Sequence, residues 1–92
     1  MRIIRKIRQK LKDQEYEITI PHFFEEMDAD DLEFEDIQSA ILTGDVERTF
    51  TRDPRGTRYE VVGQSRDGRR VAVICRFKTT GRLLLITTYL VE

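Results

Sequence analysis

Few side chains in this chain of 92 residues could carry out acid–base chemistry, whereas cationic side chains are abundant. His22 is the only histidine, and an imidazole with a reference pKa of about 6.5 can exchange a proton near neutral pH. Arg48, Arg58 and Arg76 carry guanidinium groups, which bind phosphate through paired hydrogen bonds. The alternative for His22, which follows a proline and precedes two phenylalanines, is a helix-start residue whose ring makes a structural hydrogen bond.

The net charge of −1 conceals a strong segregation of charge along the chain. Residues 1–12 carry six bases and no acids, residues 13–47 carry thirteen acids and neither lysine nor arginine, and residues 48–92 carry ten bases and four acids. A ligand senses charge within about 8 Å at physiological salt, so the blocks matter more than their sum. The last block indicates an anionic partner, while the first two are also explained as solvated helix faces.

The elements that must position these residues form an α+β pattern organised around a hairpin over 70–91. Helical spacing predicts helices over about 2–13, 22–28 and 34–43, and alternation predicts strands over about 46–51, 58–65, 70–78 and 83–91. Short turns join the strands, so we expect one domain, 1–92, with a four-stranded antiparallel meander and the N-terminal helices on one face. Residues 16–20 are expected to form a short extended segment at an edge.

The residue pattern inside the individual elements also predicts which of their faces are buried and where the third helix ends. The apolar run over 83–91 predicts a middle strand covered on both faces. The second helix is expected to turn Phe23, Phe24 and Met27 inward, and Gly44 is the expected C-terminal cap of the third helix.

Alternation along 70–78 separates two faces of that strand. Val71, Val73, Cys75 and Phe77 lie on one face, and Ala72, Ile74 and Arg76 lie on the other. If helices cover the first face, Arg76 points to the uncovered face of a central strand. Basic loops at the strand ends could then form a rim that follows a phosphate backbone. The alternative for these loop arginines is simple solvation.

The order of residues resembles a known bacterial family, the domain of unknown function 4258. The resemblance covers nearly the whole chain, from the helix that contains Ile7 and Leu11 to the final strand. It is carried by the short strand before His22, Met27 five residues later, the helix that ends at Gly44, Glu47, the segment 63–69, and the closing Ile-Thr-Thr-Tyr over 86–89. The chain departs from the family pattern at three positions. Phe23 stands in place of a common alanine, Glu26 in place of a common basic residue, and Ala72 in place of a second histidine.

This resemblance implies a fold similar to that of RelE-like toxins, and a toxin of a toxin–antitoxin pair that binds RNA and cleaves it as an endoribonuclease. Metal-independent cleavage requires a base for the 2′-hydroxyl, cations for the phosphorane and an acid for the leaving oxygen. The expected catalytic residues are His22, Glu47, Arg76 and Tyr89. The expected RNA-binding residues are Arg48, Arg52, Arg55, Arg58, Tyr59, Arg66 and Arg69.

Alternative structural roles accompany these assignments. Glu47 is also expected to pair with an arginine on a neighbouring strand, and Tyr89 to pack in the core with its hydroxyl tethered. A mechanism that needs two imidazoles could not operate here, because the chain has one histidine. This favours an alternative function, a non-catalytic module that binds protein or RNA. A homodimer formed through exposed strand edges is a third hypothesis.

The sequence lacks the residue patterns of metal sites, glycine-rich phosphate loops and membrane spans. One histidine and one cysteine cannot build an ordinary zinc site, and neither a calcium loop nor a glycine-rich phosphate loop is present, so we expect no metal or cofactor. No apolar run is long enough to span a bilayer. Cys75 is expected to be a small core residue. We therefore expect a cytoplasmic protein with no membrane partner, whose partners are RNA, such as mRNA, and a cognate antitoxin.

Overall fold

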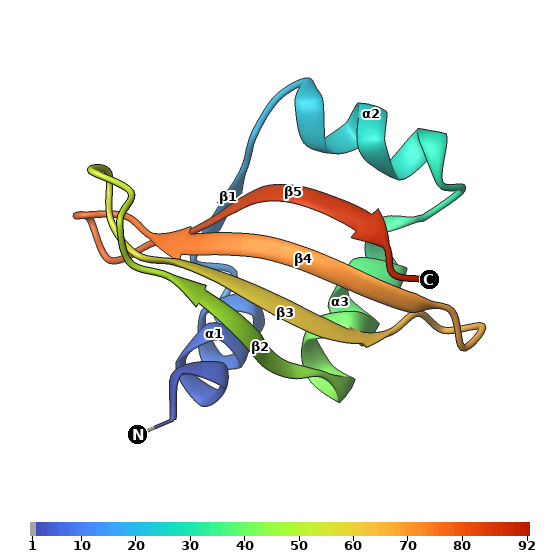
Figure 1. Ribbon diagram of the computed structural model, residues 1–92, viewed down its shortest axis with the longest axis horizontal. Helices are drawn as coiled ribbons and strands as arrows, with labels where there is room; N and C mark the ends of the chain where they lie inside the picture. Colours follow the sequence, from blue (N-terminus) through green and yellow to red (C-terminus); the bar gives the residue numbers. More distant parts are fainter. Residues whose placement is uncertain (1) are drawn as a thin grey trace.

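The computed structural model describes residues 2–92 and has an α+β fold with three helices and a five-stranded mixed sheet (Figure 1). The helices precede most of the sheet along the chain, as the sequence pattern predicts. The elements in chain order are α1 (Ile3–Lys12), β1 (Tyr16–Ile18), α2 (His22–Ala29), α3 (Phe34–Thr43), β2 (Asp45–Phe50), β3 (Arg58–Gln64), β4 (Arg70–Phe77) and β5 (Leu83–Leu90).

The strand order across the sheet is β1-β5-β4-β3-β2. Strands β2 to β5 form the expected antiparallel meander. Strand β1 adds a fifth strand, parallel to β5, with Tyr16 opposite Leu83 and Ile18 opposite Leu85. The prediction of a four-stranded, wholly antiparallel sheet is therefore wrong. Local alternation marks the segment as extended, but its pairing with a strand at the far end of the chain has no local signature.

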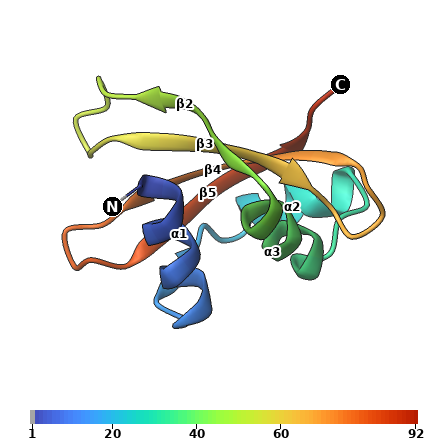
Figure 2. The ribbon, with the colours of Figure 1, turned by 90° about the horizontal axis from the view of Figure 1, so that it is seen from below.

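The helices leave one face of the sheet uncovered. Figure 2 shows α1 and α3 beneath the sheet, and Figure 1 shows α2 beside β5. The apolar stripe of α1, which comprises Ile4, Ile7 and Leu11, is buried in the core. The strand residues buried against the helices are Val61, Val71, Val73, Cys75, Leu83 and Leu85. The predicted inward face of β4 is therefore confirmed.

Helix α2 covers the part of β5 that β1 does not reach. The Glu26 carboxylate accepts hydrogen bonds from the Thr87 hydroxyl and, at 3.4 Å, from the backbone N–H of Thr88. The Asp30 carboxylate accepts one from the backbone N–H of Leu90 at 3.3 Å. Two members of the acidic block thus satisfy strand donors that would otherwise lie unpaired at an edge.

Two expectations about burial are wrong. Strand β5 is a middle strand, but Leu84 and Ile86 are only half-buried, because the helices cover one face of the sheet rather than two. Phe24 is 44% exposed, whereas its neighbour Phe23 is fully buried. Adjacent residues on a helix point about 100° apart, so one short helix resting on one surface cannot bury both.

The end of α3 lies directly against the backbone of β3. A Cβ atom at Gly63 would lie 1.9 Å from the carbonyl oxygen of Ala40, and one at Gly44 would lie 2.3 Å from that of Val62. Gly44 is the C-cap residue, as expected, but its backbone is extended rather than left-handed. These glycines therefore permit a close approach of helix and strand, which fixes the sheet on its helical layer.

Candidate functional site

The face of the sheet turned away from the helices carries four of the eleven candidate residues, Arg48, Arg58, Arg76 and Tyr89. Side chains alternate along a strand, so the residues between the buried valines of β4 point away from the core. The register aligns them across strands, with Arg58 opposite Arg76 and Arg76 opposite Leu84. We call this surface the open face; its residues are Arg48, Phe50, Arg58, Glu60, Val62, Arg70, Ala72, Ile74, Arg76, Leu84, Thr87 and Tyr89.

Arg76 lies on the open face, as the alternation of its strand predicts. One of its guanidinium nitrogens donates to the backbone carbonyl of Arg55 at 3.3 Å. Within residues 2–92, no carboxylate forms an ion pair with this guanidinium, whereas Arg48, Arg58 and Arg70 each contact one. Arg76 is thus the open-face arginine of the described chain whose charge no direct carboxylate contact offsets.

A cluster of three polar side chains lies at the centre of the open face. Glu60 on β3 accepts hydrogen bonds from Arg48 on β2, Nε to Oε1 at 3.1 Å and Nη2 to Oε2 at 2.8 Å. The Tyr89 hydroxyl on β5 donates to the same carboxylate. The Glu60 side chain is 8% exposed, whereas that of Arg48 is 63% exposed. The cluster therefore joins three strands and presents a guanidinium to solvent.

The cluster shifts the acidity of its own members. Hydrogen bonding from Arg48 holds the pKa of Glu60 below its usual value, although burial opposes this. Burial, and then the hydrogen bond to Glu60, raise the pKa of Tyr89. Glu60 is therefore ionised and Tyr89 protonated at neutral pH. Glu60 is not among the residues expected to act on RNA, although alternation along β3 places it on the same face as Arg58.

Glu47 and His22, two expected catalytic residues, lie at different edges of the sheet. Glu47 occupies the irregularity in β2 between Val46 and Arg48, and its carboxylate lies 3.5 Å from the Arg70 guanidinium. His22 begins α2 beside β5, with Nε2 3.1 Å from the Glu26 carboxylate. Strands β5 and β2 are three strand spacings apart, or about 14 Å. The structure therefore does not bring His22 and Glu47 together around one phosphate.

Tyr59, an expected RNA-binding residue, lies on the helix side of the sheet. It is opposite Cys75, whose side chain is in the core, and its ring packs edge-on against Phe77 with centroids 6.1 Å apart. Strand alternation explains this placement, because Tyr59 shares the parity of the buried Val61. Tyr59 therefore packs against the core rather than on the open face.

Arg66 and Arg69 hold the β3–β4 turn to the helical layer. Arg66 donates from Nε to the Asp36 carboxylate of α3 at 3.0 Å. Arg69 donates to the backbone carbonyls of Asp30 and Asp31 at 2.8 and 3.0 Å. This turn and the β2–β3 loop lie at opposite ends of the sheet (Figure 1), so the two basic loops do not form the expected single rim.

The ionised Asp36 carboxylate is expected to make the free energy of unfolding depend on pH. The Asp36 side chain is 6% exposed, and hydrogen bonds from Arg66 and from the backbone of Glu33 lower its pKa from 3.8 to about 2. A carboxyl whose pKa falls on folding stabilises the protein above its unfolded pKa and loses that effect as pH falls through its folded pKa. We expect Asp36→Asn to lower the free energy of unfolding by about 1 to 2 kcal/mol at pH 7, with the difference shrinking between pH 4 and pH 2.

Urea titrations followed by circular dichroism at pH 7, 4 and 2 measure this effect. Asp28→Asn, at an exposed position on α2, is the matched control and should change stability little at any of the three pH values. A deficit in Asp36→Asn that stayed constant from pH 7 to pH 2 would contradict the assignment.

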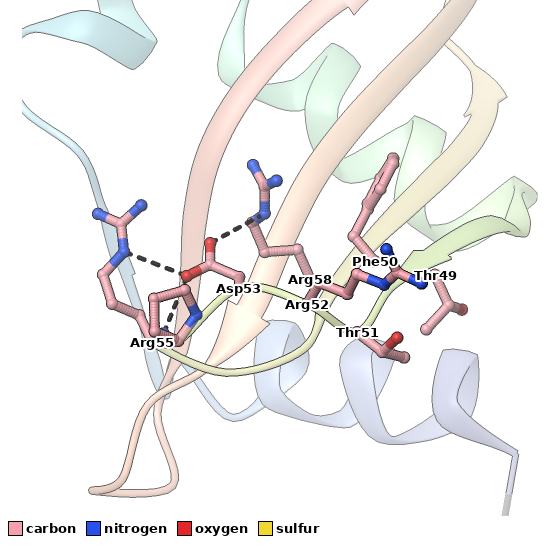
Figure 3. Close-up of a pocket in the computed structure, with 8 residues that line it drawn as sticks. Thr49, Phe50, Thr51, Arg52, Asp53, Arg55 and Arg58 are labelled. Atoms are coloured by element: carbon pink, nitrogen blue, oxygen red, sulfur yellow. Dashed lines mark hydrogen bonds and ion pairs between the residues drawn. The ribbon is translucent and has the colours of Figure 1, made fainter.

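The remaining expected RNA-binding residues line a pocket formed by the β2–β3 loop at one end of the open face (Figure 3). Its volume is about 540 Å³. Figure 3 shows the guanidinium groups of Arg55 and Arg58 on either side of the Asp53 carboxylate. We call it the loop pocket; its residues are Thr49, Phe50, Thr51, Arg52, Asp53, Pro54, Arg55 and Arg58.

Three further findings bear on other chemistries. Within residues 2–92, no three His, Cys, Asp or Glu side chains are grouped so that they could hold a metal ion. In the same range, no helix combines the length and apolar character that a membrane crossing requires. Cys75 is buried and free, and burial raises the pKa of its thiol to about 12, so it behaves as the expected core residue.

The fold and the site together define an α+β protein whose sheet presents an uncovered, arginine-bearing face. A family model described as Domain of unknown function (DUF4258) matches residues 21–90, from the residue before α2 to the end of β5. The chain belongs to this family, which confirms the resemblance over residues 21–90 but not over the helix that contains Ile7 and Leu11. Comparisons with curated proteins and with solved structures gave no match.

Proposed function

We propose that this protein binds single-stranded RNA across the open face of its sheet. The observation that carries the proposal is Arg76, which lies opposite Arg58 on a surface that no helix covers and has no carboxylate partner in the described chain. Strands β2, β3 and β4 each add at least one further arginine to this surface. Guanidinium groups repeated across adjacent strands suit a phosphate backbone, which binds through charge and counterion release.

The biological setting that we propose follows from the family resemblance. We infer that the protein is the toxin of a toxin–antitoxin pair, related to RelE-like toxins, that its RNA is mRNA, and that a cognate antitoxin neutralises it. An antitoxin that occupied the open face would block RNA directly, and its contact residues would be acidic to match the arginines.

Arg76→Ala is expected to weaken binding of single-stranded RNA about tenfold at 100 mM salt. The variant removes one phosphate contact, so the slope of log affinity against log salt should become shallower by about 0.7. Fluorescence anisotropy with a labelled RNA 12-mer at several salt concentrations measures both quantities.

The matched control is Arg5→Ala. It removes the same charge from an exposed position on α1, which lies beneath the opposite face of the sheet. Its affinity should stay within about twofold of the wild type. Equal losses in the two variants would show that RNA responds only to net charge, and no RNA binding by the wild type would remove the proposal.

A second candidate function is cleavage of the bound RNA, and the Arg48–Glu60–Tyr89 cluster favours it. A phosphate bound by Arg48 would draw that guanidinium from Glu60 and let the pKa of the carboxyl rise toward its usual value. Glu60 would then accept the proton of the 2′-hydroxyl as that oxygen attacks phosphorus, while Arg48 stabilises the phosphorane.

The remaining step requires an acid. The bond from phosphorus to the 5′-oxygen breaks, and Tyr89 donates its proton to that oxygen, leaving a 2′,3′-cyclic phosphate and a 5′-hydroxyl. Because Tyr89 is hydrogen-bonded to Glu60, transfer of the captured proton from Glu60 to Tyr89 restores both groups. Ala72, where the family pattern has a second histidine, lies opposite Tyr89. This chain therefore lacks an imidazole there, which favours RNA binding without cleavage as the competing outcome.

A further inference from the structure

The loop pocket combines an apolar lining with an unusual density of cations. Phe50 and Pro54 contribute carbon surface, and Arg52, Arg55 and Arg58 contribute three guanidinium groups. Asp53 is its only acidic lining residue. A volume of about 540 Å³ falls within the range of small-ligand sites in proteins, roughly 300 to 1,000 Å³.

Asp53 offsets one of the pocket's three positive charges and holds two of its arginines in place. Its side chain is 7% exposed, and its carboxylate accepts hydrogen bonds from the backbone N–H of Arg55 at 2.9 Å and from Arg55 Nε at 3.4 Å. Arg58 Nε lies 3.2 Å from the same carboxylate, an ion-pair contact without the direction of a hydrogen bond. Both guanidinium groups are thus held through Nε, which leaves their terminal nitrogens to bind a ligand.

Phe50 gives the pocket an aromatic and cationic surface. The guanidinium carbons of Arg48 and Arg58 each lie 5.3 Å from the centre of its ring. Nucleic-acid bases stack on aromatic rings and on guanidinium planes alike, and their phosphates bind guanidinium groups. A ligand that carries both an aromatic heterocycle and a phosphate therefore matches this surface better than a bare anion does.

The pocket is continuous with the open face. The backbone carbonyl of Arg55 accepts a hydrogen bond from Arg76, and Arg58 lies opposite Arg76 in the sheet. An RNA strand that contacts Arg76 would therefore reach the loop pocket within a short distance.

We propose that the loop pocket binds one nucleotide of the RNA strand, with its base against Phe50 and Pro54 and its phosphate on Arg52 and Arg55. This inference rests on the proposed RNA-binding function and adds to it a site that selects for a stackable base. Arg52 is exposed, so it is free to turn toward a phosphate. Asp53 acts as a positioning residue for the loop.

The test uses adenosine 5′-monophosphate, inorganic phosphate and an RNA 12-mer as probes of the full chain. Amide shifts in 15N-correlated NMR spectra should locate adenosine monophosphate at residues 49–58, and inorganic phosphate should bind at least about fivefold more weakly because it cannot stack. Phe50→Ala should weaken the mononucleotide about tenfold. Arg52→Ala should weaken binding of the mononucleotide about fivefold. Because Arg52 is exposed whereas Phe50 is half-buried, this second variant tests the site with little risk to the fold.

Arg5→Ala is the matched control, because Arg5 is exposed on α1, beneath the face of the sheet opposite the open face. It should leave mononucleotide affinity unchanged. If RNA affinity falls in Arg76→Ala but is unchanged in both Phe50→Ala and Arg52→Ala, the nucleotide site is overturned and the proposed function stays intact. Binding of the mononucleotide by a protein that does not bind the 12-mer would instead identify a free-nucleotide site and overturn both proposals.

Discussion

Glu60→Gln is expected to slow cleavage of bound RNA by about a hundredfold to ten-thousandfold, with RNA affinity equal to or higher than that of the wild type because a negative charge leaves the open face. Glutamine keeps the shape of glutamate, and an amide oxygen in the place of Oε2 can still accept hydrogen bonds from Arg48 Nη2 and Tyr89, but glutamine cannot accept a proton from a 2′-hydroxyl. The effect should therefore fall on the chemical step rather than on binding. Single-turnover cleavage of a labelled RNA, beside anisotropy for affinity, separates the two.

Three comparisons sharpen this experiment. Tyr89→Phe should also slow cleavage, because it removes the proposed acid, and a chelator should have no effect, because no step uses a metal. Glu35→Gln, at an exposed position on α3, is the matched control and should cleave at the wild-type rate. Undiminished cleavage by Glu60→Gln would remove the cluster from the mechanism. A wild-type protein that binds RNA and leaves it intact would establish the non-catalytic alternative.

Phe23→Ala is expected to lower the free energy of unfolding by about 3 to 5 kcal/mol. The Phe23 ring is fully buried and is the largest such side chain of the described residues. It packs α2 into the core, and α2 together with its C-cap residue Asp30 supplies the carboxylates that pair with β5. Small domains are typically stable by about 5 to 15 kcal/mol, so this single change would bring the fold close to unfolding. Urea titration followed by circular dichroism measures the loss.

The chain contains its own control for this change in the adjacent residue. Phe24 is 44% exposed, so Phe24→Ala should cost less than about 1 kcal/mol. Phe23→Leu keeps part of the buried volume and should lose about 1 to 2 kcal/mol, which remains measurable if the alanine variant does not fold. Similar losses for Phe23→Ala and Phe24→Ala would contradict the placement of α2.

The features predicted from the sequence were those set by local periodicity. Alternation along β4 correctly predicted that Val71, Val73 and Cys75 are buried and that Arg76 lies on the opposite face. The face on which a strand residue lies depends only on its position in that strand. The change from helical to alternating spacing near Gly44 likewise marked where α3 gives way to β2.

Features that depend on contacts between distant segments of the chain could not be predicted from local periodicity. The parallel pairing of β1 with β5 and the capture of Arg66 by Asp36 both join segments far apart in the chain. For the same reason, the sequence did not show that His22 and Glu47 lie far apart. Their residue types suggested a joint catalytic role, which the strand order prevents. Glu60 was within reach of the sequence, because alternation on β3 puts it beside Arg58, but its partners Arg48 and Tyr89 become visible only with the register.

The family match starts at Pro21, so α1 and β1 fall outside it although both are built into this structure. Helix α1 contributes Ile4, Ile7 and Leu11 to the interior, and β1 pairs with the segment 83–85. A fragment that began at Pro21 would expose the apolar core residues that α1 covers and the edge of β5 that β1 pairs with. Exposed apolar surface and unpaired strand edges both promote aggregation. For this member, the folding unit therefore extends upstream of the segment that defines its family.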